Sequence, residues 1–251
     1  MTLPHITPKQ QEILLYLYRF RFLSSIQIQK ILHNKDRRNI NIWLKDLVVN
    51  NYIGRKYENT LTDNAKPARY FLAVNGIRYL KTQQKDNLTK LRREKYRSNN
   101  FIEECLFIAD CYLQTLFDTT QAGTTFDFYT KNDYASDSLI SRLKPHFVRV
   151  KHLNKKDCYY IYELFSEKIP RFFIRSRIEH YFDFFKNVDW TKTQLPPNIF
   201  FICPEEKTEQ YVLHFAGKVR QEQSSTLSIF VTSQKELKEQ SILDSIWQHV
   251  E

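Results

Sequence analysis

An ordered series of helix-capping residues and apolar repeats in the first 84 residues limits the folds open to this chain. Thr7-Pro8, Ser24 or Ser25, and Asp36 each precede apolar residues at helical spacing, a pattern that indicates the start of a helix. The inward positions of the three segments are Ile13, Leu14, Leu17 and Tyr18; Ile28, Ile31 and Leu32; and Ile40, Leu44, Leu47 and Val48. The sequence therefore predicts three consecutive helices, the third ending at Asn50-Asn51.

The segments that follow are typical of a β-hairpin and a further helix. Residues 52–57 and 69–74 have strand character, residues 60–67 are polar and turn-like, and residues 75–84 have helical periodicity. Three helices, strand, turn, strand and helix, with the pattern Ile40-x-x-x-Leu44-x-x-Leu47-Val48-x-x-x-Tyr52-Ile53, resemble a winged helix-turn-helix. We therefore expect residues 1–84 to form a winged-helix DNA-binding domain.

The resemblance implies that the helix over residues 36–50 enters the DNA major groove. Arg and Asn read guanine and adenine edges by paired hydrogen bonds, and wing residues lie near phosphates or the minor groove. The predicted DNA contacts are Arg37, Arg38, Asn39, Asn41 and Lys45 on the helix and Arg55, Lys56, Lys66 and Arg69 on the wing. The alternatives are that these charges only solvate a helix face, or that the module binds a protein. Trp43 either packs under the wing or touches a thymine methyl group.

Positive charge is concentrated in the first part of the chain. The whole chain carries +10, whereas residues 1–97 carry +13 and residues 98–251 carry −3. A concentrated basic field attracts polyanions, and no basic amphipathic helix points to membrane headgroups, so double-stranded DNA is the favoured partner. Residues 85–97 form either a basic linker helix that lies along the DNA backbone or a solvated connector.

Residues 98–251 are predicted to form a second, α/β domain. A helix over 99–117 has an apolar stripe that packs on the C-terminal sheet or on a partner subunit, which makes it the candidate homodimer surface. Strands are expected at 126–129, 145–150, 159–165, 198–203 and 227–232, the third of them central. Helices are expected at 173–187 and around 242–247, and residues 205–218 are expected to be helical early and extended later.

This order of elements resembles the core of restriction-endonuclease-like nucleases, whose metal site uses an Asp at the second strand and Glu-x-Lys on the third. The whole chain resembles the replication-relaxation family of plasmid and mobile-element proteins. In that family Pro-Asp opens the second strand, an acidic residue ends the third, and a basic residue and a Tyr follow on the next helix. The corresponding positions here are Pro145-His146, Glu163 and Arg177-x-x-x-Tyr181. The fold class is thus α+β: a winged helix-turn-helix plus an α/β domain that resembles a PD-(D/E)XK nuclease core.

Two departures from this pattern predict that the nuclease-like domain is inactive. His146 stands where the Asp should be, and Phe165 stands where the Lys should be. A Mg²⁺ site needs two or more carboxylate oxygens, and Glu163 alone remains at the expected positions. If the domain were active, Glu163, Asp127 and Arg177 would be its catalytic residues, with Glu103 or Glu104 as further carboxylates. The alternative for Glu163 is a strand-end carboxylate paired with Arg175 or Arg177.

Other chemistry has no clear signature in the sequence. There is no phosphate-binding Gly-rich loop, no nucleophile elbow and no zinc spacing, and a soft-metal site from His146 and His152 would require both on one strand face. The cysteines at 105, 111, 158 and 203 are interpreted as reduced core residues. The aromatic residues between 159 and 185 are interpreted as core, with a base-stacking platform as the alternative. No cofactor, metal, signal peptide or membrane span is predicted, and a cytoplasmic protein associated with the nucleoid or a plasmid is expected.

The leading functional hypothesis is a non-enzymatic, sequence-specific double-stranded DNA-binding protein of a plasmid or mobile element. It would act as a regulator or as a replication or transfer accessory factor. One alternative is a metal-dependent DNA endonuclease targeted by the winged helix. Another is an adaptor whose C-terminal domain grips a protein partner while the winged helix tethers the complex to DNA.

Overall fold

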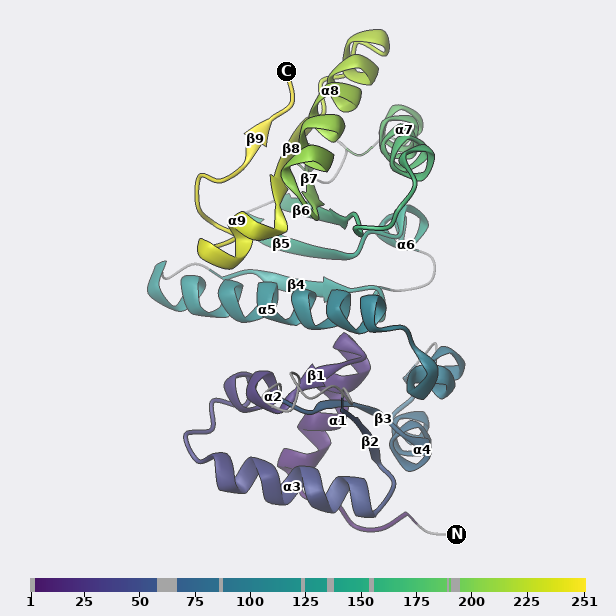
Figure 1. The fold of residues 1–251 in the computed structure, drawn as a ribbon, viewed down its shortest axis with the longest axis vertical. Helices are drawn as coiled ribbons and strands as arrows, with labels where there is room; N and C mark the ends of the chain where they lie inside the picture. Colours follow the sequence, from purple (N-terminus) through teal and green to yellow (C-terminus); the bar gives the residue numbers. More distant parts are fainter. Residues whose placement is uncertain are drawn as a thin grey trace. The chain divides into compact units, whose positions relative to one another are not determined.

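The chain folds into two units, and the boundary between them in the sequence falls within one long helix. The computed structural model describes residues 3–57, 67–85, 88–122, 125–134, 138–153, 156–188, 190 and 195–251. Contacts divide the chain into Met1–Leu113 and Gln114–Glu251, and the boundary falls inside helix α5 (Asn99–Ala122) (Figure 1). Within the described residues, no helix is both long and apolar enough to span a membrane.

The first unit begins with three helices whose N-terminal caps are those predicted from the sequence. Helices α1 (Pro8–Phe20), α2 (Ser25–Ile31) and α3 (Arg37–Val49) are capped by the side chains of Thr7, Ser24 and Asp36. Each capping oxygen accepts a backbone N–H that would otherwise lack a partner in the first helical turn. The inward residues Ile13, Leu17, Ile28, Ile40, Leu44 and Leu47 are buried as expected.

A small antiparallel sheet follows the helices in the first unit. Strands β1 (Leu23–Ser24), β2 (Ile53–Lys56) and β3 (Arg69–Leu72) pair in the order β1-β3-β2, so β2 is an edge strand. The two residues of β1 were not predicted, because a segment so short has no periodicity to detect. Helix α4 (Val74–Thr82) and the 3₁₀ helix η1 (Leu88–Tyr96) come next, and η1 buries Leu91 and Glu94 within the same unit.

The first half of α5 packs inside the first unit. Ile102 and Cys105 join a buried cluster with Phe22 and Phe71, and the ring of Tyr112 lies 5.2 Å from that of Phe20. Residues 98–113, which the sequence had placed in the C-terminal domain, are therefore part of the N-terminal unit. Because the stripe is used for packing within the chain, we do not retain the prediction of a homodimer through this helix.

The second unit is built on a mixed six-stranded sheet. Strands β4 (Asp127–Thr130), β5 (Phe147–Leu153), β6 (Lys156–Leu164), β7 (Asn198–Cys203), β8 (Ser228–Ser233) and β9 (Gln248–His249) lie in sequence order across the sheet. Strands β6, β7 and β8 are parallel, and the other neighbouring pairs are antiparallel. The strand over residues 159–165 is interior to the sheet, as predicted.

The two faces of this sheet are covered differently. Helices α6 (Leu139–Leu143), α7 (Arg171–Asn187) and α8 (Glu206–Glu222) cover one face over an aliphatic and aromatic core (Figure 1). On the opposite face a row of stacked rings crosses five strands: Phe128, Phe147, Tyr162, Phe200 and Phe230. These rings are buried or nearly so, which favours the core interpretation over a base-stacking platform.

Two local predictions for the C-terminal part were wrong, and one helix was not predicted. Residues 205–218 do not become extended, because α8 continues to Glu222 with Val212, Ala216 and Val219 buried at helical spacing. The helix expected around 242–247 is replaced by turns, and a helix lies earlier instead, at α9 (Gln234–Glu239), capped by Ser233. Helix α6 was not predicted, since its five residues give too short a pattern.

Candidate functional site

Helix α3 presents a row of polar and basic side chains to solvent. Because Ile40, Leu44 and Leu47 face the core, the remaining positions of the helix must point outward. The residues predicted to face DNA are all exposed: Arg37, Arg38, Asn39, Asn41 and Lys45. Trp43 is half-buried, so the choice between packing and DNA contact stays open.

Part of this row lines a groove of about 750 Å³ in the first unit. Arg37, Asn41 and Lys45 from α3 line it together with Arg55 of β2. The guanidinium of Arg55 lies 4.5 Å from the centre of the Tyr57 ring, an arrangement that orients the cation. The other lining residues are Ser25, Ile26, Leu44, Val48, Val49, Tyr57, Pro67, Ala68 and Tyr70. Ile26 and Tyr57 were missed from the sequence, because only the packing of α2 and β2 brings them to α3.

The predicted wing residues are not all available for contact. Arg69 is 5% exposed and its guanidinium pairs with Glu103 of α5, so we remove it from the predicted interface. Lys56 is half-buried and its Nζ donates to the backbone oxygen of Arg97 at 2.9 Å. Lys66 lies outside the described residues. Of the wing residues that the structure describes, Arg55 is the one whose side chain is exposed and lines the groove with α3.

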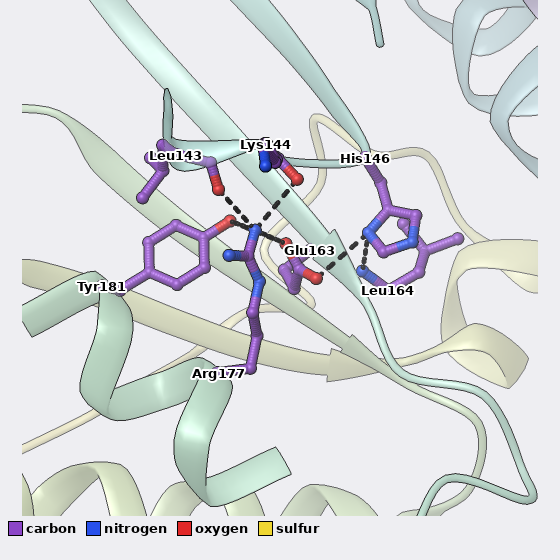
Figure 2. A network of polar contacts seen from close by, with 7 residues as sticks. All are labelled: Leu143, Lys144, His146, Glu163, Leu164, Arg177 and Tyr181. Atoms are coloured by element: carbon purple, nitrogen blue, oxygen red, sulfur yellow. Dashed lines mark hydrogen bonds and ion pairs between the residues drawn. The ribbon is translucent and has the colours of Figure 1, made fainter. Parts of the chain in front are cut away.

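In the second unit, Glu163 forms the centre of a buried polar network (Figure 2). Glu163 lies near the end of β6 and is 5% exposed. Its Oε2 accepts from Nη2 of Arg177 and from the hydroxyl of Tyr181, both at 2.8 Å. Arg177 Nη2 also donates to the backbone oxygens of Leu143 and Lys144, at 2.8 and 3.0 Å. The prediction that Glu163 pairs with Arg175 or Arg177 is confirmed, with Arg177 as the partner.

His146 completes this network from the segment before β5. Its Nδ1 lies 3.3 Å from Glu163 Oε1 and 3.1 Å from the backbone nitrogen of Leu164. One ring nitrogen holds one of these bonds at a time: with a proton it donates to Glu163, and without one it accepts from Leu164. Figure 2 shows the imidazole and the guanidinium on opposite sides of the carboxylate, so neighbouring groups already surround both carboxylate oxygens.

The surroundings of Glu163 hold it in the ionised form. Burial by itself would raise the pKa of Glu163, but His146 and Arg177 outweigh burial and hold that pKa well below its ordinary value. Burial and the charge of Glu163 raise the pKa of Tyr181 well above its usual range, so the phenol remains a hydrogen-bond donor. The network therefore keeps Glu163 negatively charged beside the guanidinium of Arg177. This arrangement is that of a structural ion pair.

The other candidate metal-binding residues are not brought to Glu163. Asp127 pairs across the sheet with Val150 of β5. Val150 lies four residues from His146, which is about 13 Å at the rise of a β-strand. Glu103 belongs to the first unit, where it pairs with Arg69. Phe165, at the position of the motif's Lys, is buried. Within the described parts of the chain, there is no group of three or more His, Cys, Asp or Glu side chains that could hold a metal ion.

His152 forms a separate, exposed arrangement at the other end of β5. Its Nδ1 lies 2.7 Å from Asp157 Oδ1 and its Nε2 lies 2.9 Å from Asp127 Oδ2. The hydrogen bond to Asp127, followed by that to Asp157, raises the pKa of His152. The structure thus places His146 and His152 in different networks, and this placement does not favour the alternative of a soft-metal site formed by the two.

The fold and these sites define a two-unit α/β protein with a cationic groove in one unit and a buried carboxylate network in the other. The replication-relaxation family matches residues 14–160, more than half of the chain, and the chain belongs to that family. No curated protein matches it.

Two solved structures are similar to the chain at low identity. One is the restriction endonuclease FokI, at 12% identity and a TM-score of 0.30, covering 91% of this chain and 42% of that one. The other is the restriction endonuclease FokI bound to DNA, at 13% identity and a TM-score of 0.28, covering 91% of this chain and 43% of that one. The chain therefore spans well under half of the length of these structures.

Proposed function

We propose that this protein binds double-stranded DNA in a sequence-specific manner and serves a plasmid or mobile element. In that setting it acts as a regulator or as a replication or transfer accessory factor. The observation that carries the proposal is the groove that Arg37, Asn41 and Lys45 of α3 line together with Arg55 of β2. Membership of the replication-relaxation family supports a role connected with replication.

In this proposal the first unit is a winged helix-turn-helix. Helices α2 and α3 form the helix-turn-helix, and β2 and β3 form the wing. Helix α3 enters the major groove, where Arg and Asn can read base edges, while Arg55 lies beside the phosphate backbone. Arg37, Lys45 and Arg55 are exposed side chains of the same groove, where a polyanion can reach them.

We further propose that the second unit is a nuclease-like fold that has lost its metal chemistry and serves binding or assembly. Oε2 of Glu163 already accepts from Arg177 and Tyr181, and Nδ1 of His146 lies 3.3 Å from Oε1. A divalent ion would have to displace the guanidinium from this carboxylate, and Asp127, the predicted carboxylate on the same sheet, lies opposite Val150, four residues along β5 from His146.

An electrophoretic mobility shift on duplex DNA from beside the protein's own coding region, with and without Mg²⁺, tests the proposal. We expect a discrete shift and intact DNA. Arg37→Ala and Asn41→Ala should each relax site preference by roughly 1–3 kcal/mol, read by selection from a random duplex pool. Lys218→Ala, which removes an exposed charge on α8, is the control and should bind as the wild type does.

A different experimental result would contradict each part of the proposal. An unchanged selected sequence in Arg37→Ala and Asn41→Ala would remove α3 as the reading element. Mg²⁺-dependent cleavage that disappears in Glu163→Ala would overturn the non-enzymatic assignment. The absence of a shift on any duplex would mean that the first unit serves a protein partner.

A further inference from the structure

A second and larger groove lies in the first unit between the sheet and the segment that follows it. It has a volume of about 900 Å³ and is bordered by β2 and β3 on one side and by α4 and η1 on the other. Such a volume lies in the range of about 300–1,000 Å³ in which ligand sites usually fall. The proposed duplex contact on α3 does not use this groove, and Arg55 of β2 is the lining residue that the two grooves share.

The floor of this groove is apolar. Phe71, Leu72, Ile77 and Leu91 line it. The ring of Phe71 lies against Gly54. A Cβ atom at residue 54 would come within 2.3 Å of this ring, so glycine leaves the space that the ring occupies beneath the groove. A floor of this kind favours flat apolar groups over phosphates or free ions.

The rim of the groove is cationic and carries an exposed aromatic ring. Four exposed basic side chains line it, and Tyr96 at the end of η1 is 81% exposed. The four are Arg55, Arg78, Arg92 and Lys95, while Lys56 also lines the groove but donates to the backbone oxygen of Arg97. Glu94 is the one acidic residue among the lining residues, and it is buried and paired with Arg21. The rim is therefore strongly positive.

From this combination we infer that the groove between β2–β3 and α4–η1 binds single-stranded DNA. Phosphates of a strand would meet the rim cations while its bases stack on Tyr96 and rest on the apolar floor, which is how single strands are held without sequence readout. Duplex DNA would present phosphates to the rim but keep its bases stacked inside, so the floor would remain unfilled. An acidic peptide would satisfy the rim, but unlike a nucleic-acid strand it does not supply a flat ring beside every negative charge.

Fluorescence anisotropy with a labelled single-stranded mixed-sequence oligonucleotide and with the matching duplex tests this inference. Tyr96→Ala should weaken single-strand binding roughly 5- to 150-fold, the range for loss of one stacked base, whereas Tyr96→Phe should retain it. The charge variants Arg92→Ala and Lys95→Ala should also weaken it. Arg93→Ala is the matched control, because Arg93 is an exposed cation of the same η1 segment that does not line the groove.

Binding to the duplex separates this inference from the proposed function. We expect the η1 variants to leave duplex binding unchanged, and Arg37→Ala to weaken duplex binding while leaving single-strand binding unchanged. Failure of duplex binding alone would overturn the proposed function and not this inference. No single-strand binding by the wild type in low-salt buffer, or equal losses in Tyr96→Ala and Arg93→Ala, would overturn the single-strand site. All substituted side chains in η1 are exposed, so the variants are expected to fold.

Discussion

The charge on Glu163 stabilises the fold because hydrogen-bond donors are held in place around its carboxylate. We expect Glu163→Gln to lower the free energy of unfolding by about 3 kcal/mol, since it leaves the half-buried guanidinium of Arg177 without its counter-charge. Urea unfolding followed by the fluorescence of Trp190 and Trp247 in the same unit measures this loss. The exposed neighbour Glu167, changed to Gln, should shift stability by less than about 0.5 kcal/mol.

A double-mutant cycle checks that the effect belongs to the ion pair. Arg177→Met removes the guanidinium, so the further change of Glu163 to Gln should cost less in that background than in the wild type. Additive losses would contradict the coupling inferred from the 2.8 Å contact. Because the pKa of Glu163 is lowered in the folded state, its contribution is present above the ordinary carboxyl pKa and is lost as pH falls below it.

His152 provides a second prediction at the level of a single residue. Its hydrogen bonds to Asp127 and Asp157 raise its pKa above the ordinary value of about 6.5, which NMR titration of the ring protons can measure. A raised histidine pKa adds stability that is complete below about pH 6.5 and is lost as pH rises through the folded-state pKa. Asp127→Asn should bring the pKa back toward its ordinary value. A wild-type pKa no higher than that of an ordinary histidine would contradict the contacts.

Helix α8 and strand β9 are joined by a carboxyl group that titrates near neutral pH. Glu209 is buried on α8 and accepts from the side chain of Gln248 on β9 at 2.6 Å. Burial, followed by the charges of Glu236 and Glu206, raises the pKa of Glu209 to about 7. The folded state therefore binds a proton that the unfolded chain releases at lower pH, and stability should fall as pH rises from about 4.5 to 7.

We expect Glu209→Gln to remove this fall in stability. The amide keeps the hydrogen-bond acceptor without the charge, so the variant should match the wild type near pH 4 and exceed it at about pH 8, by on the order of 1–3 kcal/mol. Thermal unfolding at the two pH values measures the difference. Glu222→Gln, at an exposed position of the same helix, is the control: it keeps Glu209, so its stability should fall between the two pH values as that of the wild type does. A constant difference between Glu209→Gln and the wild type at both pH values would exclude titration of Glu209 as the cause.

Local signals decided which elements could be predicted from the sequence. The caps at Thr7, Ser24 and Asp36 and the apolar spacing behind them placed α1, α2 and α3, and with them the exposed face of α3. Strand β7 was placed at its observed bounds because it is a continuous apolar run. The two-residue β1 and the five-residue α6 are too short for a pattern and were missed.

Interactions between distant residues explain why the candidate site was only partly predicted. Arg69 is a basic residue of a predicted wing strand, but its partner Glu103 lies 34 positions away on α5. No sequence pattern around Arg69 predicts that pairing. The groove between β2–β3 and α4–η1 was missed for the same reason, since it exists only once η1 folds back beside β2 and β3. The pair of Glu163 and Arg177 could be foreseen because a strand end and the following helix meet locally in such a fold.

At the scale of the whole molecule, charge is divided between two parts of the chain. Residues 1–97 carry +13 and residues 98–251 carry −3, so attraction to a polyanion is concentrated in the first part. Phosphate neutralisation releases counterions, which makes affinity fall steeply with salt. If about 6 to 10 phosphates are neutralised, duplex affinity should fall about 10³- to 10⁵-fold between roughly 50 and 200 mM salt.

The salt dependence of full-length variants can locate the charges that act. Lys45→Gln with Arg55→Gln should reduce the slope of log affinity against log salt by about 2, one for each phosphate that is no longer neutralised. Arg142→Gln with Lys218→Gln removes the same charge from exposed positions of α6 and α8 and should leave the slope unchanged. Equal reductions in the two pairs would mean that net charge, and not the groove on α3, drives binding. A slope that changes only in the first pair would require that DNA lies against α3, because counterion release is local to the phosphates that are neutralised.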